Sequence, residues 1–244
     1  MAILAIDQGN SSAKVSLWTD GEIVENRRFE ILTIEDLLPF IAENNVEGCI
    51  YCSVKHTDAR FLESLRQAVE GRLVVLTSSV KLPFDIHYSK ETPLGADRIA
   101  AIAGAAVLEK GKGALVVDMG TAMTLDVVDR DGNFMGGNIS PGLRLRFESL
   151  ASADKLPQLT AAGEISDFGD DTSSAIRDGV VMGMAAEVID SFERAIKDFG
   201  VSSLILTGND AKIVAEVLKK RNISFIYDKD LVGRGLNMIY QALR

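Results

Sequence analysis

An internal repeat constrains this chain more than any other feature. The segment D-Q-G-N-S, which begins at Asp7, follows the apolar run Ile3–Ile6, and the segment D-M-G-T-A, which begins at Asp118, follows the apolar run Ala114–Val117. A single D-x-G match is common, but two matches after two apolar runs are not. The repeat therefore predicts two units that start with the same local structure.

Each copy continues as a predicted β-hairpin. Alternating segments at Ala13–Trp18 and Met123–Val128 follow the two glycine turns, and Asp-Gly pairs follow at Asp20 and Asp131, each thirteen residues after the first Asp of its copy. An Asp-Gly pair between alternating segments is a strong hairpin signal. Each copy thus reads as strand, glycine turn, strand, Asp-Gly turn and third strand, and the copies align without a gap.

Helices and strands alternate after each hairpin. Periodicity and turn residues predict helices at Ile34–Glu43 (with Thr33 as N-cap), Asp58–Val69, Ala96–Glu109, Pro141–Ala151, Ser174–Asp198, Ala211–Lys220 and Leu236–Leu243, with strands at Cys49–Val54, Leu73–Thr77, Ser203–Thr207 and Ser224–Tyr227. Gly111 and Gly113 mark a boundary. We predict an α/β chain with domains at 1–111 and 112–244, sizes that each suit one core.

Charge and cysteine content exclude several classes of protein. The chain has 26 basic and 35 acidic residues, and its longest basic run is Lys219-Lys220-Arg221, which favours a solvated helix end over a nucleic-acid surface. Cys49 and Cys52 have C-x-x-C spacing but lie in a predicted strand, where residues three apart point to opposite faces. We expect two structural thiols, not a redox pair or a zinc site.

The N-terminal segment indicates a cytoplasmic protein. It has no charged region ahead of its apolar run, and that run is too short for a signal peptide or a membrane span. We therefore expect no membrane and no nucleic acid among the partners.

The repeated D-x-G loops have the chemistry of a phosphate site. A carboxylate at a strand end can hold Mg²⁺, the glycine lets phosphate approach the backbone, and the following Asn, Ser or Thr and N–H groups can donate to phosphate oxygens. Lys14 adds a positive charge in the first copy. The alternative is a plain turn between strands. Two copies favour the phosphate interpretation, because two such loops suit a nucleoside triphosphate.

The segment P-L-G-A-D-R, at residues 93–98, opens an apolar helix. Taken alone, the segment favours an ordinary helix start, where an acidic residue such as Asp97 interacts well with the helix dipole. In the functional interpretation, Asp97 accepts a proton from a substrate hydroxyl and the planar fork of Arg98 binds a carboxylate. Positioning and charge neutralisation dominate phosphoryl transfer, so a modestly basic Asp is adequate.

Two further segments are weaker signals. G-G-N-I-S-P-G, at residues 136–142, can approach a ligand closely or simply follow a hairpin, and L-T-G-N-D, at residues 206–210, is a strand-to-helix turn of a kind that commonly touches nucleotides. Arg144 and Arg146 follow the first of these segments, and the sequence assigns them no role.

In this order and spacing, the D-x-G-N-S, G-A-D-R, D-x-G-T-A, G-G-N-I-x-P-G and T-G motifs resemble type III pantothenate kinase from Asp7 to Thr207. The resemblance implies two ribonuclease-H-like domains of the actin/hexokinase type, with mixed sheets flanked by helices and a cleft between them. It also implies a cytoplasmic homodimer that phosphorylates pantothenate with ATP in the first step of coenzyme A synthesis. Mg²⁺ and a monovalent cation, K⁺ or NH₄⁺, are its implied cofactors.

The same resemblance implies a role for individual residues. Asp97 would be the general base, Asp118 would hold the monovalent cation, and Thr172 would contact pantothenate across the dimer. The remaining implied contacts are Tyr88, Gly95, Ala96, Asp97 and Arg98 for pantothenate, and Asp7, Gln8, Gly9, Asn10, Ser11, Ser12, Ala13, Lys14 and Thr121 for ATP.

The chain departs from the family at Asn209, where the family often has a second glycine after T-G. Asn tolerates left-handed backbone geometry well, so the turn can survive. Two rival functions stay open at this point. One is a sugar kinase or polyphosphate hydrolase of the same superfamily, although larger sugar kinases need more chain. The other is a nucleotide-binding regulator without catalysis, which retention of Asp7, Asp97, Arg98 and Asp118 disfavours.

Overall fold

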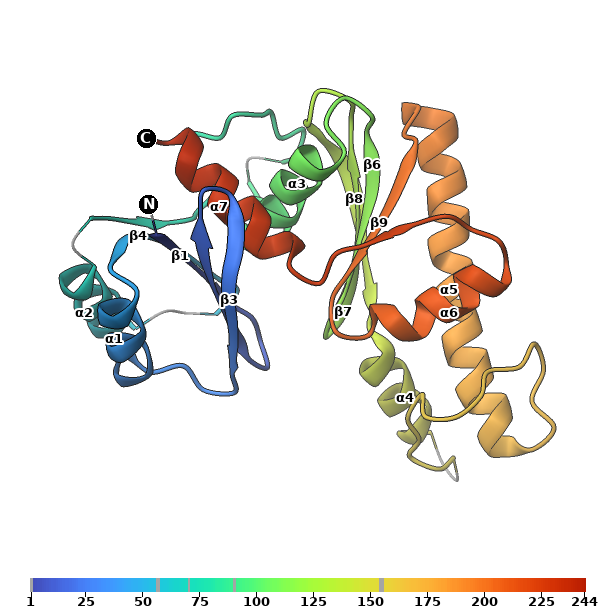
Figure 1. Cartoon of the computed structure of the whole chain (residues 1–244). Helices are drawn as coiled ribbons and strands as arrows, with labels where there is room; N and C mark the ends of the chain where they lie inside the picture. The colour runs from blue at the N-terminus through green and yellow to red at the C-terminus, as the bar shows by residue number, and fades with distance from the viewer. Residues whose placement is uncertain (1, 56–57, 70, 90, 154–155) are drawn as a thin grey trace. The chain divides into compact units, whose positions relative to one another are not determined.

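The computed structural model describes residues 2–55, 58–69, 71–89, 91–153 and 156–244. The chain divides into two compact units (Figure 1). The first holds the chain up to Leu108 together with Asp230–Arg244, and the second holds Glu109–Lys229. Within the described residues, no helix is both long enough and apolar enough to cross a membrane.

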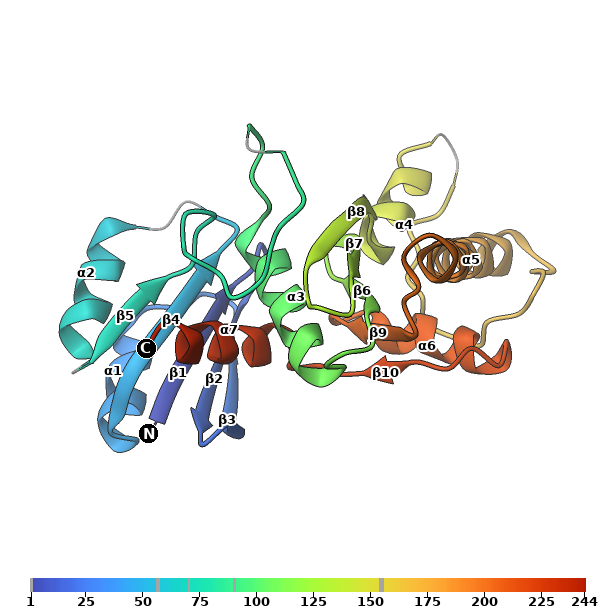
Figure 2. The same cartoon turned by 90° about the horizontal axis from the view of Figure 1, so that it is seen from above.

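The first unit is built on a five-stranded mixed sheet with the order β3-β2-β1-β4-β5, which Figure 2 shows from above. The strand β1 pairs antiparallel with β2 and parallel with β4. Its strands and helices are β1 (Ala2–Gln8), β2 (Ala13–Thr19), β3 (Glu22–Phe29), α1 (Ile34–Glu43), β4 (Val46–Ser53), α2 (Ala59–Ala68), β5 (Arg72–Val75), α3 (Ala96–Leu108) and α7 (Leu231–Ala242).

Strand alternation divides this sheet into two faces. Leu4 and Ile6 of β1 point into a core that Leu37 of α1 and Leu65 of α2 complete. The residues that alternate with them along β1, which are Ile3, Ala5 and Asp7, belong to the opposite face. Helices α3 and α7 pack against each other and against the sheet. The two helix pairs therefore cover opposite faces, and Asp7 belongs to the face of α3 and α7.

Local signals account for several element boundaries. Helix α1 begins with the predicted N-cap: the Thr33 side chain accepts from the Asp36 N–H, and the Asp36 carboxylate accepts from the Thr33 N–H. Such a capping box satisfies N–H groups that the helix cannot pair internally. The Asp20-Gly21 turn has positive φ angles of 52° and 86°, as a two-residue hairpin turn requires.

The second unit repeats the first. Its sheet has the order β10-β9-β6-β7-β8, so both sheets place the first hairpin strand at the centre and join it to parallel strands on its other side. Its strands and helices are β6 (Ala114–Met119), β7 (Ala122–Val128), β8 (Phe134–Pro141), α4 (Leu143–Ala151), α5 (Thr172–Phe199), β9 (Ser203–Thr207), α6 (Ala211–Lys220) and β10 (Ile226–Tyr227). The predicted α/β repeat is confirmed.

The gapless alignment of the two copies is wrong inside the hairpin. Asp7 pairs with Lys14, whereas Asp118 pairs with Thr124 and not with Leu125, which a gapless alignment would match to Lys14. The glycine turn of the second copy is therefore one residue shorter. Its next turn is one residue longer: the Asp129 N–H donates to the Asn133 carbonyl, which leaves three residues in the turn where the first copy has two. The two changes cancel, which explains why the Asp-Gly pairs keep the same offset.

The C-terminal helix differs from the predicted domain boundary. The sequence placed residues 230–244 in the second domain, but α7 packs with α3 and β1 in the first unit. Its buried residues Leu231, Leu236 and Ile239 form the apolar face that makes this contact. Continuity along the chain suggested the wrong partner, because the apolar stripe does not say which sheet it covers.

Smaller corrections concern strand and helix ends. Strand β4 begins at Val46, three residues before the predicted start at Cys49, and β8 runs to Pro141, where we predicted helix. Helix α7 begins at Leu231 instead of Leu236. Cys49 and Cys52 are free and buried, as expected of structural thiols.

Candidate functional site

The first group of predicted residues gathers at the carboxyl end of β1. Asp7 lies between two neighbouring strands, paired with Lys14 on β2 and with Cys52 on β4. Residues paired across adjacent strands point to the same face. The Asp7 carboxylate, the Lys14 amine stem and the Cys52 thiol therefore share the face that α3 and α7 cover.

The environment of Asp7 opposes its negative charge. Burial raises the pKa of its carboxyl above the ordinary value of 3.8, the positive charge of Lys14 lowers it, and the negative charge of Asp97 raises it further. The Cys52 Sγ lies 3.6 Å from Asp7 Oδ1, within range of a thiol hydrogen bond. A desolvated carboxylate beside another carboxylate gains from a cation, so this position suits one that a phosphate ligand brings with it.

The loop after Asp7 forms a tight turn. The Gly9 N–H donates to the Ser12 carbonyl at 3.0 Å, and the Arg28 guanidinium donates to the Ser12 hydroxyl at 3.0 Å. Asn10 and Ser11 are exposed at its tip, while Ala13 is buried and starts β2. The turn leaves the side chains of Asn10 and Ser11 available to donate to a ligand.

Asp97 and Arg98 lie at the start of α3. The Arg98 N–H donates to Asp97 Oδ1 at 2.9 Å, and the Ile99 N–H donates to the Gly95 carbonyl at 3.0 Å. Arg98 is only 6% exposed, with its guanidinium carbon 5.8 Å from the centre of the Tyr88 ring. Tyr88 is exposed. The structure therefore brings Tyr88, Gly95, Ala96, Asp97 and Arg98 together, and the charge of Asp97 acts on Asp7.

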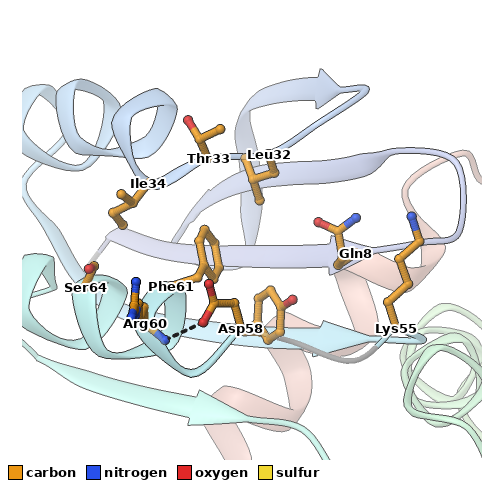
Figure 3. A pocket seen from close by; sticks show the side chains of 10 residues that line it. Gln8, Leu32, Thr33, Ile34, Lys55, Asp58, Arg60, Phe61 and Ser64 are labelled. Atoms are coloured by element: carbon orange, nitrogen blue, oxygen red, sulfur yellow. Dashed lines mark hydrogen bonds between the residues drawn. The ribbon is translucent and has the colours of Figure 1, made fainter.

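Gln8 belongs to the opposite face of the sheet. It lines a cavity of about 400 Å³ with Tyr51 and Phe61, whose rings are 5.8 Å apart. Figure 3 shows Gln8 and Lys55 at one side of this cavity and Arg60 at the other. The Gln8 amide donates to the Gly9 carbonyl at 3.3 Å. The structure thus separates Gln8 from Asp7, and its side chain supports the loop from behind.

The second group lies in the second unit, at the carboxyl end of β6. Asp118 pairs with Thr207 of β9, and Gly208 follows Thr207 with a φ of +93°. A Cβ at residue 208 would lie 2.5 Å from Asp118 Oδ1 and equally close to the backbone of Met119. Only glycine fits this position, since both the backbone angle and the contact exclude a side chain. The T-G turn therefore packs directly on the Asp118 carboxylate.

Thr121 forms part of the same surface. The Gly142 N–H donates to the Thr121 carbonyl at 3.1 Å, and the Asp210 N–H donates to the Met119 carbonyl at 3.1 Å. These bonds tie the start of α4 and the start of α6 to the glycine turn of the repeat. Burial raises the pKa of the Asp210 carboxyl. The three motifs that the sequence kept apart thus meet around Asp118.

Thr172 lies elsewhere in the second unit. It is exposed at the start of α5 and lines a groove of about 660 Å³ with apolar residues of α4 and α5, among them Leu145, Leu150 and Ile176. Neither Asp118 nor Thr121 lines this groove. Thr172 therefore belongs to this groove and not to the group of residues around Asp118.

The structure explains the two unassigned arginines. Arg146 lies beside the groove and donates to the Pro141 carbonyl, the Ser140 hydroxyl and the Glu187 carboxylate, so it joins β8, α4 and α5. Arg144 forms an exposed i,i+4 ion pair with Glu148. Arg146 therefore links three elements of the second unit. The ion pair of Arg144 contributes little to stability, as is typical of exposed pairs.

The candidate cation ligands at these two strand ends are single carboxylates. Within the described part of the chain, no three His, Cys, Asp or Glu side chains gather into a cluster that could hold a metal alone. Mg²⁺ in phosphate-transfer sites is held by one or two carboxylates together with substrate phosphates and water. Asp7 and Asp118, each at a strand end, fit ions that share their ligands with ATP.

Cys52 was missed as a site residue. Its sequence context indicated only a buried strand, and its spacing to Cys49 drew attention to pairing between thiols. The signal that identifies it is register: once β1 and β4 are adjacent and parallel, Asp7 lies opposite Cys52. Gly142 and Gly208 were recognised within motifs, but their contacts with the D-x-G turn were not.

A family model described as type III pantothenate kinase matches residues 3–194. Curated proteins named type III pantothenate kinase are similar along nearly the whole chain. One from Phocaeicola vulgatus is 35% identical, with 97% of this chain and 96% of that protein covered. One from Porphyromonas gingivalis is 34% identical, with 98% and 97% covered.

Solved structures support the fold. A conserved protein from Campylobacter jejuni, assigned to the Baf family of transcriptional activators, has a TM-score of 0.66 at 24% identity, with 98% of both chains covered. The ROK hexokinase from Thermus thermophilus has a TM-score of 0.60 at 12% identity, with both chains fully covered. At these identities the likeness concerns the fold alone, and it confirms the predicted actin/hexokinase type.

Proposed function

The chain belongs to the type III pantothenate kinase family, and we propose that it catalyses the ATP-dependent phosphorylation of pantothenate, the first step of coenzyme A synthesis, with Asp97 as its base. The observation that carries the residue assignment is the first group of side chains. Asp97 and Arg98 open α3, and the charge of Asp97 acts on Asp7 at the head of the phosphate loop. The proposed base therefore lies beside the proposed phosphate site.

The surroundings of Asp97 support its proposed role as base. Its carboxylate is partly exposed at the first turn of α3, held by the Arg98 N–H. The hydroxyl of pantothenate would donate to this carboxylate and lose its proton to it as its oxygen attacks the γ-phosphorus of ATP, and the bond from that phosphorus to the β–γ bridging oxygen would break to release ADP. In such a transfer the enzyme mainly positions the reactants and neutralises charge.

Arg98, with Tyr88, Gly95 and Ala96, would hold the body of pantothenate. A guanidinium can form two parallel hydrogen bonds to a carboxylate, which pantothenate carries at the end opposite its reacting hydroxyl. The nearby Tyr88 ring limits the directions available to the Arg98 side chain. Recognition at the far end would then fix the orientation of the hydroxyl near Asp97.

The loop from Asp7 to Lys14 would bind the phosphates of ATP. Exposed Asn10 and Ser11 supply donors at its tip, and Lys14 supplies positive charge next to Asp7. Gln8 would act through its bond to Gly9, since its side chain is on the other face of the sheet. Mg²⁺, when bound, would neutralise phosphate charge at this loop, and the carboxylate of Asp7 would hold the ion there.

In the second unit, Asp118 would hold the monovalent cation, K⁺ or NH₄⁺, and Thr121 would contact ATP. The contact between Gly208 and Asp118 supports the first role, because a backbone turn packed on the carboxylate fixes where its oxygens lie. The bond from Gly142 to the Thr121 carbonyl supports the second, because it fixes the stretch of backbone that carries the Thr121 side chain.

We further propose a homodimer in the cytoplasm, with Thr172 reaching the pantothenate of the partner. Thr172 is exposed at a groove with apolar walls, which is the kind of surface that association buries. The cytoplasm follows from ATP as the phosphoryl donor.

Release of ADP, measured with and without pantothenate and in K⁺ and Na⁺, tests the function. We expect release that requires pantothenate and is faster in K⁺ than in Na⁺. A panel of sugars serves as the control for acceptors. Release with a sugar and not with pantothenate, or ATP binding without release for any acceptor, would overturn the proposal.

A further inference from the structure

Cys52 is a buried thiol directly beside the phosphate loop. It lies on β4, opposite Asp7 in the parallel pairing with β1, and is 1% exposed. Its Sγ is 3.6 Å from Asp7 Oδ1. The distance and the shared face of the sheet place an S–H donor against one oxygen of a carboxylate that heads the loop.

The thiol acts as the donor toward Asp7. Its Sγ lies within hydrogen-bonding range of Asp7 Oδ1, and a carboxylate oxygen accepts such a bond. What Cys52 offers Asp7 is therefore a hydrogen bond.

Two charges of opposite sign act on the Asp7 carboxylate. Lys14, on β2, attracts the carboxylate, and Asp97, at the start of α3, repels it. A short side chain at a strand end can rotate in response to either. A donor on β4, on the side away from β2, limits that rotation, because β4 is fixed to β1 by the sheet.

We propose that Cys52 is a positioning residue, which holds Asp7 Oδ1 so that the carboxylate and the loop after it stay oriented for MgATP. This inference rests on the proposed role of the Asp7–Lys14 loop. Cys52 itself touches no reactant. Its effect is on the binding of MgATP, and the pantothenate side of the reaction does not depend on it.

Three variants test this role. Cys52→Ser keeps a donor of similar size, Cys52→Ala removes it, and Cys49→Ala removes an equally buried thiol from the same strand on the face toward α1 and α2. We expect Cys52→Ala to raise KM for MgATP by about 10-fold, in line with loss of one hydrogen bond to a charged group. Its kcat and its KM for pantothenate should change by less than about threefold.

Cys52→Ser should stay within about threefold of the parent in KM for MgATP. Cys49→Ala should lower the melting temperature without changing KM. An unchanged KM for MgATP in Cys52→Ala would overturn the inference, and so would an equal rise in Cys49→Ala or no rescue by Ser. Direct binding of MgATP to the same variants separates this result from the proposed function, because binding is measurable even if no ADP is released with pantothenate.

Discussion

Asp97 Oδ1 accepts the main-chain N–H of Arg98, so the Asp97 carboxylate folds back over the first turn of α3. This placement depends on the residue two positions earlier. A Cβ at Gly95 would lie 2.7 Å from Asp97 Oδ1, closer than such atoms approach in proteins. The glycine of the G-A-D-R motif thus makes room for the carboxylate that we propose as the base.

Gly95→Ala tests this dependence. The new methyl group meets only the end of a side chain, so the Asp97 carboxylate can rotate away without a backbone shift. We expect the fold to survive, with a melting temperature within about 3 °C of the parent, while kcat falls about 10-fold or more. Steady-state kinetics and thermal unfolding check both expectations. An unchanged kcat would show that the observed carboxylate position is not needed.

Arg98→Lys tests recognition of the substrate. Lysine keeps the charge but loses the planar fork, so its bond to a carboxylate is weaker and less directional. We expect KM for pantothenate to rise about 10-fold or more and KM for MgATP to change little. Arg60→Lys, an exposed change on α2, is the matched control. A selective effect on MgATP would assign Arg98 to the other substrate.

Gly208→Ala tests the turn that packs on Asp118. Alanine there suffers both the positive φ and a contact with the Met119 backbone. Gly21→Ala is the matched control, because Gly21 has a φ of +86° but open space around its Cβ position. We expect a loss of about 1 to 2 kcal/mol for Gly21→Ala and a clearly larger loss for Gly208→Ala. Denaturant unfolding measures both losses. Equal losses would contradict the claim that the turn at Gly208 packs on Asp118.

Gly208→Ala should also weaken the response to K⁺, whereas Gly21→Ala should not. The ratio of rates in K⁺ and Na⁺ measures this. A ratio that Gly208→Ala leaves unchanged would argue against Asp118 as the cation site.

The Ser203 hydroxyl predicts a pH-dependent stability. Its hydrogen bond to Glu109 is the main cause of a lowered pKa for that carboxyl, with Lys112 adding to it. A lowered folded-state pKa stabilises the fold above the ordinary value of 4.5, and this stabilisation is lost as pH falls through the folded-state pKa. We therefore expect Ser203→Ala to cost about 1 to 2 kcal/mol at pH 7 and progressively less below pH 4.5.

Ser202→Ala is the control for this pH dependence. The Ser202 hydroxyl donates to the backbone carbonyl of Lys112 at 3.1 Å, and this acceptor does not titrate. Its loss should cost the same at both ends of the pH range. Thermal unfolding between pH 3 and pH 7 distinguishes the two serines, and parallel curves for them would contradict the assigned cause.

The repeat made most of the fold predictable from sequence. Two D-x-G loops after apolar runs predicted the three hairpin-connected strands that begin each unit, and Thr33 as an N-cap predicted a helix start. What local pattern does not contain is the choice of distant partners. The apolar stripe of α7 says that it packs on something, but only the folded chain shows that it returns to α3.

The same limit explains which site residues were found. Asp97 and Arg98 were recognised because they are adjacent in sequence within a motif. Cys52 was not, because its relation to Asp7 exists only through the register of β1 and β4, which β2, β3 and α1 separate along the chain. The shortened turn at Thr121 was hidden for a related reason, since a compensating residue between Asp129 and Asn133 restores the spacing.

The most direct test of the account is the rate of pantothenate-dependent ADP release by Asp97→Asn compared with the parent protein. Asparagine keeps the shape of the side chain and its acceptor oxygen for the Arg98 N–H, but it cannot take up the hydroxyl proton. We expect kcat to fall by about 10² to 10⁴, with the melting temperature and MgATP binding preserved. Turnover near that of the parent would show that Asp97 is not the base and would contradict the central claim.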